Sequence, residues 1–255
     1  MTDPWDDLDR ELDAWQAAGL VATFWLRDDD AQADTPALQR LLEIGRDAGA
    51  PISLAVIPRN ASADLAEAVS AFDNVDVLQH GWCHANHAGR DEKKFELGDH
   101  RPLEVIGQEL ERGDERLRKL FGNRYYKILA PPWNRIGPVT ADALAGWGYQ
   151  GLSVFGPRDR TSAAGGVVYA NTHVDIIDWK GTRGYRGDDQ VLEQALAHLR
   201  ARREGQADRD EPTGLITHHL VHDEACWAFI MMFVTHTRQH PAVRWLRLPE
   251  VFGLD

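Results

Sequence analysis

Short apolar runs alternate with longer stretches of helical period along most of the 255-residue chain. Apolar runs at residues 21–26, 52–57 and 75–78 predict strands, and stretches such as residues 36–48 repeat their apolar side chains with a helical period. Strands that alternate with helices form βαβ units around a parallel sheet. About seven such units in a chain of this length favour an α/β barrel over an open sheet with a second domain.

The same pattern predicts the rest of the architecture. Further strands are expected at residues 126–129, 151–155, 167–174, 214–220 and 243–248, and helices at residues 36–48, 63–72, 103–121, 139–147, 190–203 and 224–239. Thr35 and Pro36 are typical of a helix start, and Gly49 of a helix end. No change in composition divides the chain, so we expect one barrel domain over residues 1–255.

Charge and composition exclude several classes of protein. The formal net charge is −12, which argues against a nucleic-acid binder and against a polybasic membrane anchor. Two cysteines cannot form a disulfide framework or a four-thiolate zinc site. The acidic N-terminus does not resemble a secretion signal, and the longest apolar stretch, residues 226–234, is too short to span a membrane. We therefore expect a cytoplasmic protein; its oligomeric state is not indicated.

Polar side chains cluster directly after predicted strands. The clusters are Asp28, Asp29 and Asp30; His80, His84 and His87; and His218, His219 and His222. An aspartate triplet alone is also typical of a solvated turn. In a parallel barrel, however, the carboxyl ends of the strands share one face, which is where catalytic residues gather. The shared position therefore predicts a single functional site.

The spacing of His80 and His84 favours a metal site. Residues four apart share one side of a helical turn, and imidazole nitrogens with a carboxylate oxygen suit Zn²⁺. Neighbouring carboxylates repel one another unless a cation is present. His236 and His240 have the same spacing but fall late in a predicted helix, so we interpret them as helix surface. For His219 and His222 we expect a packing role.

Five segments in order resemble the motifs of the polysaccharide deacetylase family, the NodB-homology domain of family 4 carbohydrate esterases. The segments are Arg27-Asp28-Asp29-Asp30, His80 to His84, Ala130-Pro131-Pro132-Trp133-Asn134, Asp175-Ile176-Ile177-Asp178-Trp179, and Ile216-Thr217-His218. The resemblance implies a distorted (β/α) barrel, with about seven or eight units. It also implies hydrolysis of an N-acyl bond with the help of a divalent metal.

Carried over residue by residue, the resemblance implies a role for each motif. Asp29, His80 and His84 would hold the metal, Asp28 would be the catalytic base, and His218 would protonate the leaving nitrogen. The residues that would line the acyl pocket are Trp133, Trp179, Ile216 and Pro132. The ion expected is Zn²⁺, with Co²⁺, Mn²⁺ and Fe²⁺ left open.

Two departures from the family pattern leave alternatives open. A third aspartate stands where the family has glycine, so a register shifted by one would make Asp29 the base and Asp30 the ligand; we favour Asp28 and Asp29. Ala130 replaces the arginine that orients the base in the family. Arg27 or Arg135 could supply that charge, because both lie near the motifs in sequence.

The function predicted is metal-dependent hydrolysis of a carbon–nitrogen bond, with an N-acetylated sugar or a related small molecule as substrate. An allantoinase-like or amidase-like hydrolase of the same superfamily is an alternative. So is a glycoside hydrolase, which would need two carboxylates about 5–10 Å apart without a metal. A non-catalytic carbohydrate-binding or regulatory barrel is a further alternative, supported by Ala130.

Overall fold

A parallel β-sheet forms the centre of the molecule. The computed structural model describes residues 3–159 and 164–254. The strands are β1 (Ala22–Ala31), β2 (Ile52–Val56), β3 (Val75–Gln79), β4 (Tyr125–Leu129), β5 (Gly151–Leu152), β6 (Val168–Tyr169), β7 (Val174–Asp175), β8 (Thr213–Thr217) and β9 (Val243–Trp245). They lie in the order β6-β5-β4-β3-β2-β1-β8-β7, with β9 paired to β1.

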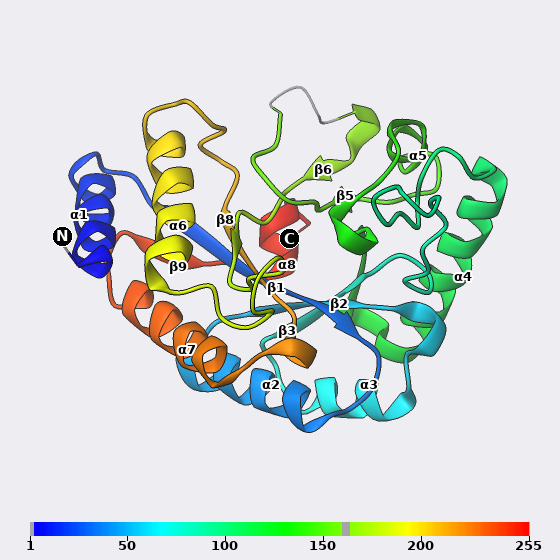
Figure 1. Cartoon of the computed structure of the whole chain (residues 1–255), viewed down its shortest axis with the longest axis horizontal. Coiled ribbons are helices and arrows are strands. Elements are labelled where there is room, and N and C mark those ends of the chain that lie inside the picture. The colour runs from blue at the N-terminus through cyan, green and yellow to red at the C-terminus, as the bar shows by residue number, and fades with distance from the viewer. Residues whose placement is uncertain (1–2, 160–163, 255) are drawn as a thin grey trace.

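Helices surround this curled sheet (Figure 1). They are α1 (Pro4–Ala17), α2 (Pro36–Ala48), α3 (Ala63–Ser70), α4 (Leu103–Phe121), α5 (Pro138–Ala143), α6 (Asp188–Arg203), α7 (Glu224–Arg238) and α8 (Leu248–Phe252). Each pairing between neighbouring strands is parallel. The expected distorted α/β barrel is therefore confirmed.

Local sequence explains where the helices begin and end. The Thr35 side chain accepts a hydrogen bond from the Leu38 backbone N–H at 3.1 Å, which satisfies a donor that the first helical turn leaves free. Gly49 ends α2 with a φ of 74°, a left-handed conformation that glycine adopts without a steric penalty. The start of α2 at Thr35 and Pro36 and its end at Gly49 are therefore as the sequence predicts.

The apolar core of the described residues has three parts. The largest packs the sheet against the outer helices, a second fills the inside of the curl, and a third joins residues of α4, β4 and β5. Helix α8 lies inside the curve of the strands (Figure 1), where the Phe252 ring meets the Trp25 indole edge-on, with 6.1 Å between ring centroids. Apolar side chains therefore fill this part of the interior, as is usual in a barrel of parallel strands.

Several elements differ from the sequence expectation. Strand β1 continues through the aspartate triplet to Ala31, because it is paired with β2 and β8 on either side. The strand expected at residues 167–174 is divided into β6 and β7. Helices α1 and α8 were not expected; the Asp3 side chain caps α1 and accepts the Trp5 N–H at 3.0 Å.

None of the helices in the described part of the chain combines the length and the apolar character needed to cross a membrane.

Candidate metal centre and active site

Three side chains that could hold a metal ion meet at the carboxyl ends of β1 and β3. The Asp30 Oδ1 atom lies 3.2 Å from His80 Nε2 and 3.3 Å from His84 Nε2. Zinc bonds to nitrogen and oxygen are about 2.0–2.2 Å long, so tetrahedral ligand atoms are separated by roughly 3.3 Å. The three atoms therefore have the spacing that one small divalent ion requires.

The hydrogen bonds around these side chains also fit a metal. The buried Asp30 Oδ1 atom has no hydrogen-bond partner among the described residues. His80 Nδ1 lies 2.8 Å from the Ala130 carbonyl oxygen, so this nitrogen carries the proton and donates it. That tautomer leaves the lone pair of Nε2 free, as metal-binding histidines usually have it. Asp30, His80 and His84 thus form a suitable donor set for a divalent metal.

Burial and charge shift the pKa values of this group. Burial disfavours the charged form of Asp30, but the close approach of His80 outweighs the effect of burial and lowers the Asp30 pKa. Burial likewise disfavours protonated His80, yet Asp29 and Asp30 raise its pKa. Burial and the neighbouring His80 lower the pKa of His84. A carboxylate beside a neutral His84 ring is the form in which these groups bind metal.

Backbone strain is concentrated in the same place. Asp30, His84 and Trp133 have φ values of 73°, 56° and 57°. Left-handed conformations cost side-chain-bearing residues about 1–3 kcal/mol each, and they cluster at functional sites. The Trp133 ring lies against the His84 ring, with 4.3 Å between centroids. The strained turns therefore hold an indole directly beside the candidate ligands.

The aspartate register shifts by one residue relative to the favoured expectation. Asp28, expected as the base, is fully buried; its carboxylate accepts hydrogen bonds from the Thr217 hydroxyl at 2.7 Å and the His219 backbone N–H at 2.9 Å. Its other oxygen lies 2.5 Å from His219 Nδ1, and the Asp28 pKa is lowered because His219 outweighs the effect of burial. Asp30, not Asp29, is the carboxylate grouped with the two imidazoles.

Asp29 is held by Arg27 instead. Alternate residues of a strand point to the same side, which brings these two side chains together on β1. Arg27 Nε and Nη2 donate to the two Asp29 carboxylate oxygens at 2.8 and 3.0 Å. Arg27 Nη1 also donates to the Ser153 hydroxyl at 2.7 Å. Arg135 lies elsewhere and donates to the Lys94 carbonyl oxygen at 2.9 Å, so of the two candidate arginines it is Arg27 that contacts the aspartate triplet.

His218 stands on the other side of Asp29. Its Nε2 atom lies 4.0 Å from Asp29 Oδ2, and its ring meets the Trp179 indole edge-on at 4.8 Å between centroids. The Trp179 indole N–H donates to Asp175 Oδ2 at 2.8 Å, and burial raises the Asp175 pKa. The fourth and fifth motifs, which are far apart in the chain, therefore meet beside Asp29.

The other expected site residues lie at different distances from this centre. Pro132 is buried against the Gly81 backbone, and Ile216 is buried in β8 opposite Arg27. His222 Nε2 accepts the His218 backbone N–H at 3.1 Å, and burial lowers the His222 pKa to about 4. His87 is exposed and outside the metal-binding group.

Sequence reasoning missed three residues that support the site. They are Ser153, which accepts from Arg27; Asp175, which holds Trp179; and Glu96, whose buried carboxylate accepts backbone N–H groups of the His80–His84 turn. Asp175 was quoted only as part of a motif. Glu96 stands in a polar stretch without periodicity, so the sequence offers no signal for it.

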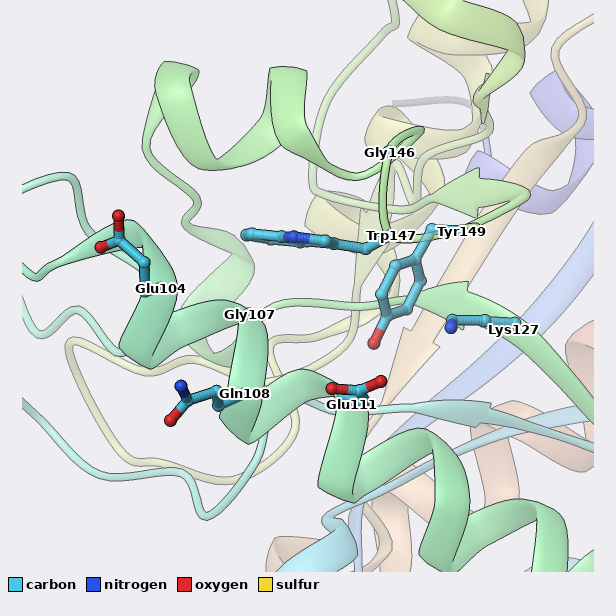
Figure 2. Close-up of a pocket in the computed structure, with 8 residues that line it drawn as sticks. All are labelled: Glu104, Gly107, Gln108, Glu111, Lys127, Gly146, Trp147 and Tyr149. Atoms are coloured by element: carbon cyan, nitrogen blue, oxygen red, sulfur yellow. The ribbon is translucent and has the colours of Figure 1, made fainter.

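Two other features lie apart from this site. His173, His198 and Glu211 form a second, fully buried group of two imidazoles and a carboxylate. A separate hollow of about 400 Å³ lies on the outside of the barrel. Its lining includes Glu104 and Glu111 of α4 and the Trp147 indole (Figure 2). None of the residues of this hollow belongs to the candidate centre.

Known structures with a similar fold include polysaccharide deacetylases and family 4 carbohydrate esterases. A Mycobacterium smegmatis protein assigned to the polysaccharide deacetylases superposes with a TM-score of 0.65 at 15% sequence identity, covering 91% of this chain and 90% of the other. The chain has the fold of the polysaccharide deacetylases. The resemblance inferred from its motifs is thus confirmed at the level of structure.

Two further neighbours differ in what they are described to do. A family 4 acetyl xylan esterase from Clostridium thermocellum, in complex with a cobalt ion, has a TM-score of 0.53 at 14% identity, with 91% of both chains covered. A pseudoenzyme of carbohydrate esterase family 4 from Bacillus anthracis has a TM-score of 0.58 at 14% identity, covering 91% of this chain and 66% of its own. No protein-family model matches the sequence, and no curated protein matches it.

Proposed function

We propose that this protein is a metal-dependent hydrolase that cleaves the carbon–nitrogen bond of an N-acetylated sugar or a related small N-acyl compound. One observation carries the proposal: Asp29 lies between the Arg27 guanidinium and His218, directly beside Asp30 and the two imidazoles. A base, an acid and a metal-binding group are the parts that metal-assisted amide hydrolysis needs.

Asp30, His80 and His84 would hold the ion, and Zn²⁺ suits this donor set best. When bound, the ion supplies Lewis-acid activation of water and of the acyl oxygen. Asp29 then acts as the general base, because Arg27 orients both of its oxygens. The role assigned to Asp28 by the favoured register passes to Asp29, and the role of Asp29 passes to Asp30.

His218 would deliver a proton to the leaving nitrogen. Its Nε2 atom lies 4.0 Å from Asp29 Oδ2, which is beyond hydrogen-bond distance, so this nitrogen is not committed to the base. Trp133 and Trp179 lie against His84 and His218, so they would exclude water and stack on a sugar ring. Pro132 and Ile216 would complete the acyl pocket; their burial in the wall of the site is compatible with that role.

The alternative of a non-catalytic barrel rested on the missing arginine at Ala130. Arg27 now offers a guanidinium to Asp29 from its own strand, which removes that support. A pseudoenzyme with a similar fold keeps the alternative as a possible outcome of the test. The glycoside hydrolase alternative loses ground, because a donor set fitted to a metal is not part of that chemistry.

The decisive experiment is a product screen on metal-stripped and reloaded protein. We expect acetate release from N-acetylated sugars after addition of Zn²⁺ or Co²⁺, and none after chelation. Ammonia release from ureides would assign the allantoinase-like alternative. Full activity after exhaustive chelation would contradict the metal role, and release of neither product from reloaded protein would favour the non-catalytic barrel.

A further inference from the structure

Glu96 is a buried carboxylate outside the set of residues that could bind a metal. It is 0% exposed and lies in the polar stretch between β3 and α4. A buried charge is costly unless hydrogen bonds or opposite charges compensate it. Among the described residues, no Lys or Arg side chain forms a salt bridge with this carboxylate. Its compensation must therefore come from another source.

That source is the turn that carries His80 and His84. The Cys83 backbone N–H donates to Glu96 Oε1 at 2.8 Å, and the Ala85 N–H reaches the same oxygen at 3.4 Å. The Trp82 N–H donates to Oε2 at 3.3 Å. One carboxylate thus gathers three N–H groups on both sides of His84. Concave arrangements of successive N–H groups are known to bind anions.

The backbone of the His80–His84 turn is strained, and it leaves space for the Glu96 carboxylate. His84 has a φ of 56°, which side-chain-bearing residues rarely adopt, so other contacts must hold it. Gly81 has a φ of 59°, and a Cβ atom there would come within 2.1 Å of Glu96 Oε2. Glycine at position 81 therefore gives the carboxylate the room it needs to reach the turn.

The backbone of Glu96 is anchored independently of the turn. Arg101 Nη1 donates to the Glu96 carbonyl oxygen at 3.0 Å. The next residue, Leu97, accepts the Gly137 N–H at 2.8 Å. Arg101 is also paired with Glu109 on α4 at 2.9 Å. The carboxylate is thus presented from a fixed support, and the turn is shaped around it.

We propose that Glu96 is a positioning residue that shapes the His80–His84 turn before metal binds, so that His84 Nε2 meets Asp30. This inference rests on the proposed metal centre. Residues that orient metal ligands in this way typically change metal affinity by about 10- to 100-fold when replaced.

The test compares Glu96→Gln with Glu92→Gln. Glu92 lies in the same polar stretch, is exposed and accepts the Gly89 N–H at 3.0 Å, so it is a matched control. Zn²⁺ affinity would be measured by competition with a chromogenic chelator, and unfolding of the metal-free proteins by circular dichroism. For Glu96→Gln we expect affinity to fall by about tenfold or more, while Glu92→Gln binds like the wild type.

Equal Zn²⁺ affinity of Glu96→Gln and the wild type would overturn the inference, even if the variant is less stable, because a purely structural role affects unfolding alone. If Glu96→Gln does not fold, hydrogen exchange of the metal-free wild type decides. Protected amides at Trp82 and Cys83 are expected, and rapid exchange of both would contradict a turn shaped in advance. Failure of the wild type itself to bind Zn²⁺ would instead refute the proposed metal centre.

Discussion

Two groups of two imidazoles and one carboxylate lie near opposite ends of β8, and they are built differently. The group of Asp30, His80 and His84 is at the carboxyl end of the sheet, where Asp30 and His84 keep 29% and 25% of their side chains exposed. The second group is fully buried: His173 precedes β7, His198 is on α6, and Glu211 precedes β8. The two groups have the same inventory of donor atoms.

The tautomers of the imidazoles separate the two groups. His80 Nδ1 faces the Ala130 carbonyl oxygen, so its proton is on Nδ1 and Nε2 is free. His173 Nδ1 instead accepts the Gly214 backbone N–H at 3.1 Å. The proton of a neutral His173 ring is therefore on Nε2, which points at Glu211 Oε2 from 3.4 Å. A nitrogen that carries a proton cannot bind a metal.

The geometry of the rings also favours the first group over the second as a metal site. His173 and His198 are stacked with 3.4 Å between centroids and an interplanar angle of 12°. A metal lies in the plane of the ring that binds it, so stacked parallel rings do not aim their lone pairs at one point. The ring centroids of His80 and His84 are 5.3 Å apart and the ring planes are tilted by 34°. The Nε2 atoms of both rings approach Asp30 Oδ1. The comparison teaches that hydrogen bonds to the second ring nitrogen, not the donor inventory, indicate a metal site.

The largest effect, loss of both the ion and turnover, should come from removing an imidazole from the first group and not from the second. His80→Ala should lose the bound ion, and with it several kcal/mol of transition-state stabilisation, which is about 10³-fold in rate. His173→Gln should keep the ion, because the Nε2 atom of His173 in the wild type carries a proton and does not bind the metal. Elemental analysis and turnover after dialysis measure both. Metal lost from His173→Gln and kept by His80→Ala would reverse the comparison.

The roles within the first group can be sharpened with two isosteric variants. Asp29→Asn should keep the metal and lower turnover by about 10²- to 10⁴-fold, because a general base is removed. Asp28→Asn should keep most of the turnover and lose roughly 1.5–3 kcal/mol of stability, since its charge-assisted hydrogen bonds to His219 and Thr217 are weakened. If Asp29→Asn lost the metal while Asp28→Asn lost turnover alone, the unshifted register would be correct.

The smallest effect concerns the second group and pH. Burial lowers the His198 pKa to about 2, and it lowers the His173 pKa as well. The unfolded chain takes up a proton on each ring below pH about 6.5, whereas the folded chain does not, so stability falls as pH falls. One such histidine removes about 1.4 kcal/mol between pH 7.5 and 5.5.

His198→Gln should therefore lose less stability than the wild type over this range, by about the same 1.4 kcal/mol. Urea unfolding of both chelator-treated proteins at pH 7.5 and 5.5 measures the difference. An unchanged dependence on pH in His198→Gln would mean that the buried ring is already protonated in the folded chain. That result would contradict the distinction between the buried group of His173, His198 and Glu211 and the metal-binding group of Asp30, His80 and His84.

Much of the fold follows from local sequence. Helices α2 and α4 have the bounds that periodicity and end signals predict, because capping and amphipathic spacing are local properties. The end of β1 does not follow from local sequence. Three aspartates read as a loop, and only pairing with β2 and β8 keeps them in a strand. For the same reason the Arg27–Asp29 pair could be named only as one of two candidates.

The sequence by itself determined the alternation of strands and helices and the presence of three His-x-x-x-His spacings. Position along the chain set one of these pairs apart as helix surface, and in the structure His236 and His240 pair with Asp9 and Asp13 at the end of α7. The tertiary structure alone decided which aspartate meets His80. The direction in which a strand side chain points depends on strand pairing and on local backbone conformation, here the φ of 73° at Asp30. Three identical residues in a row give no sequence signal for either.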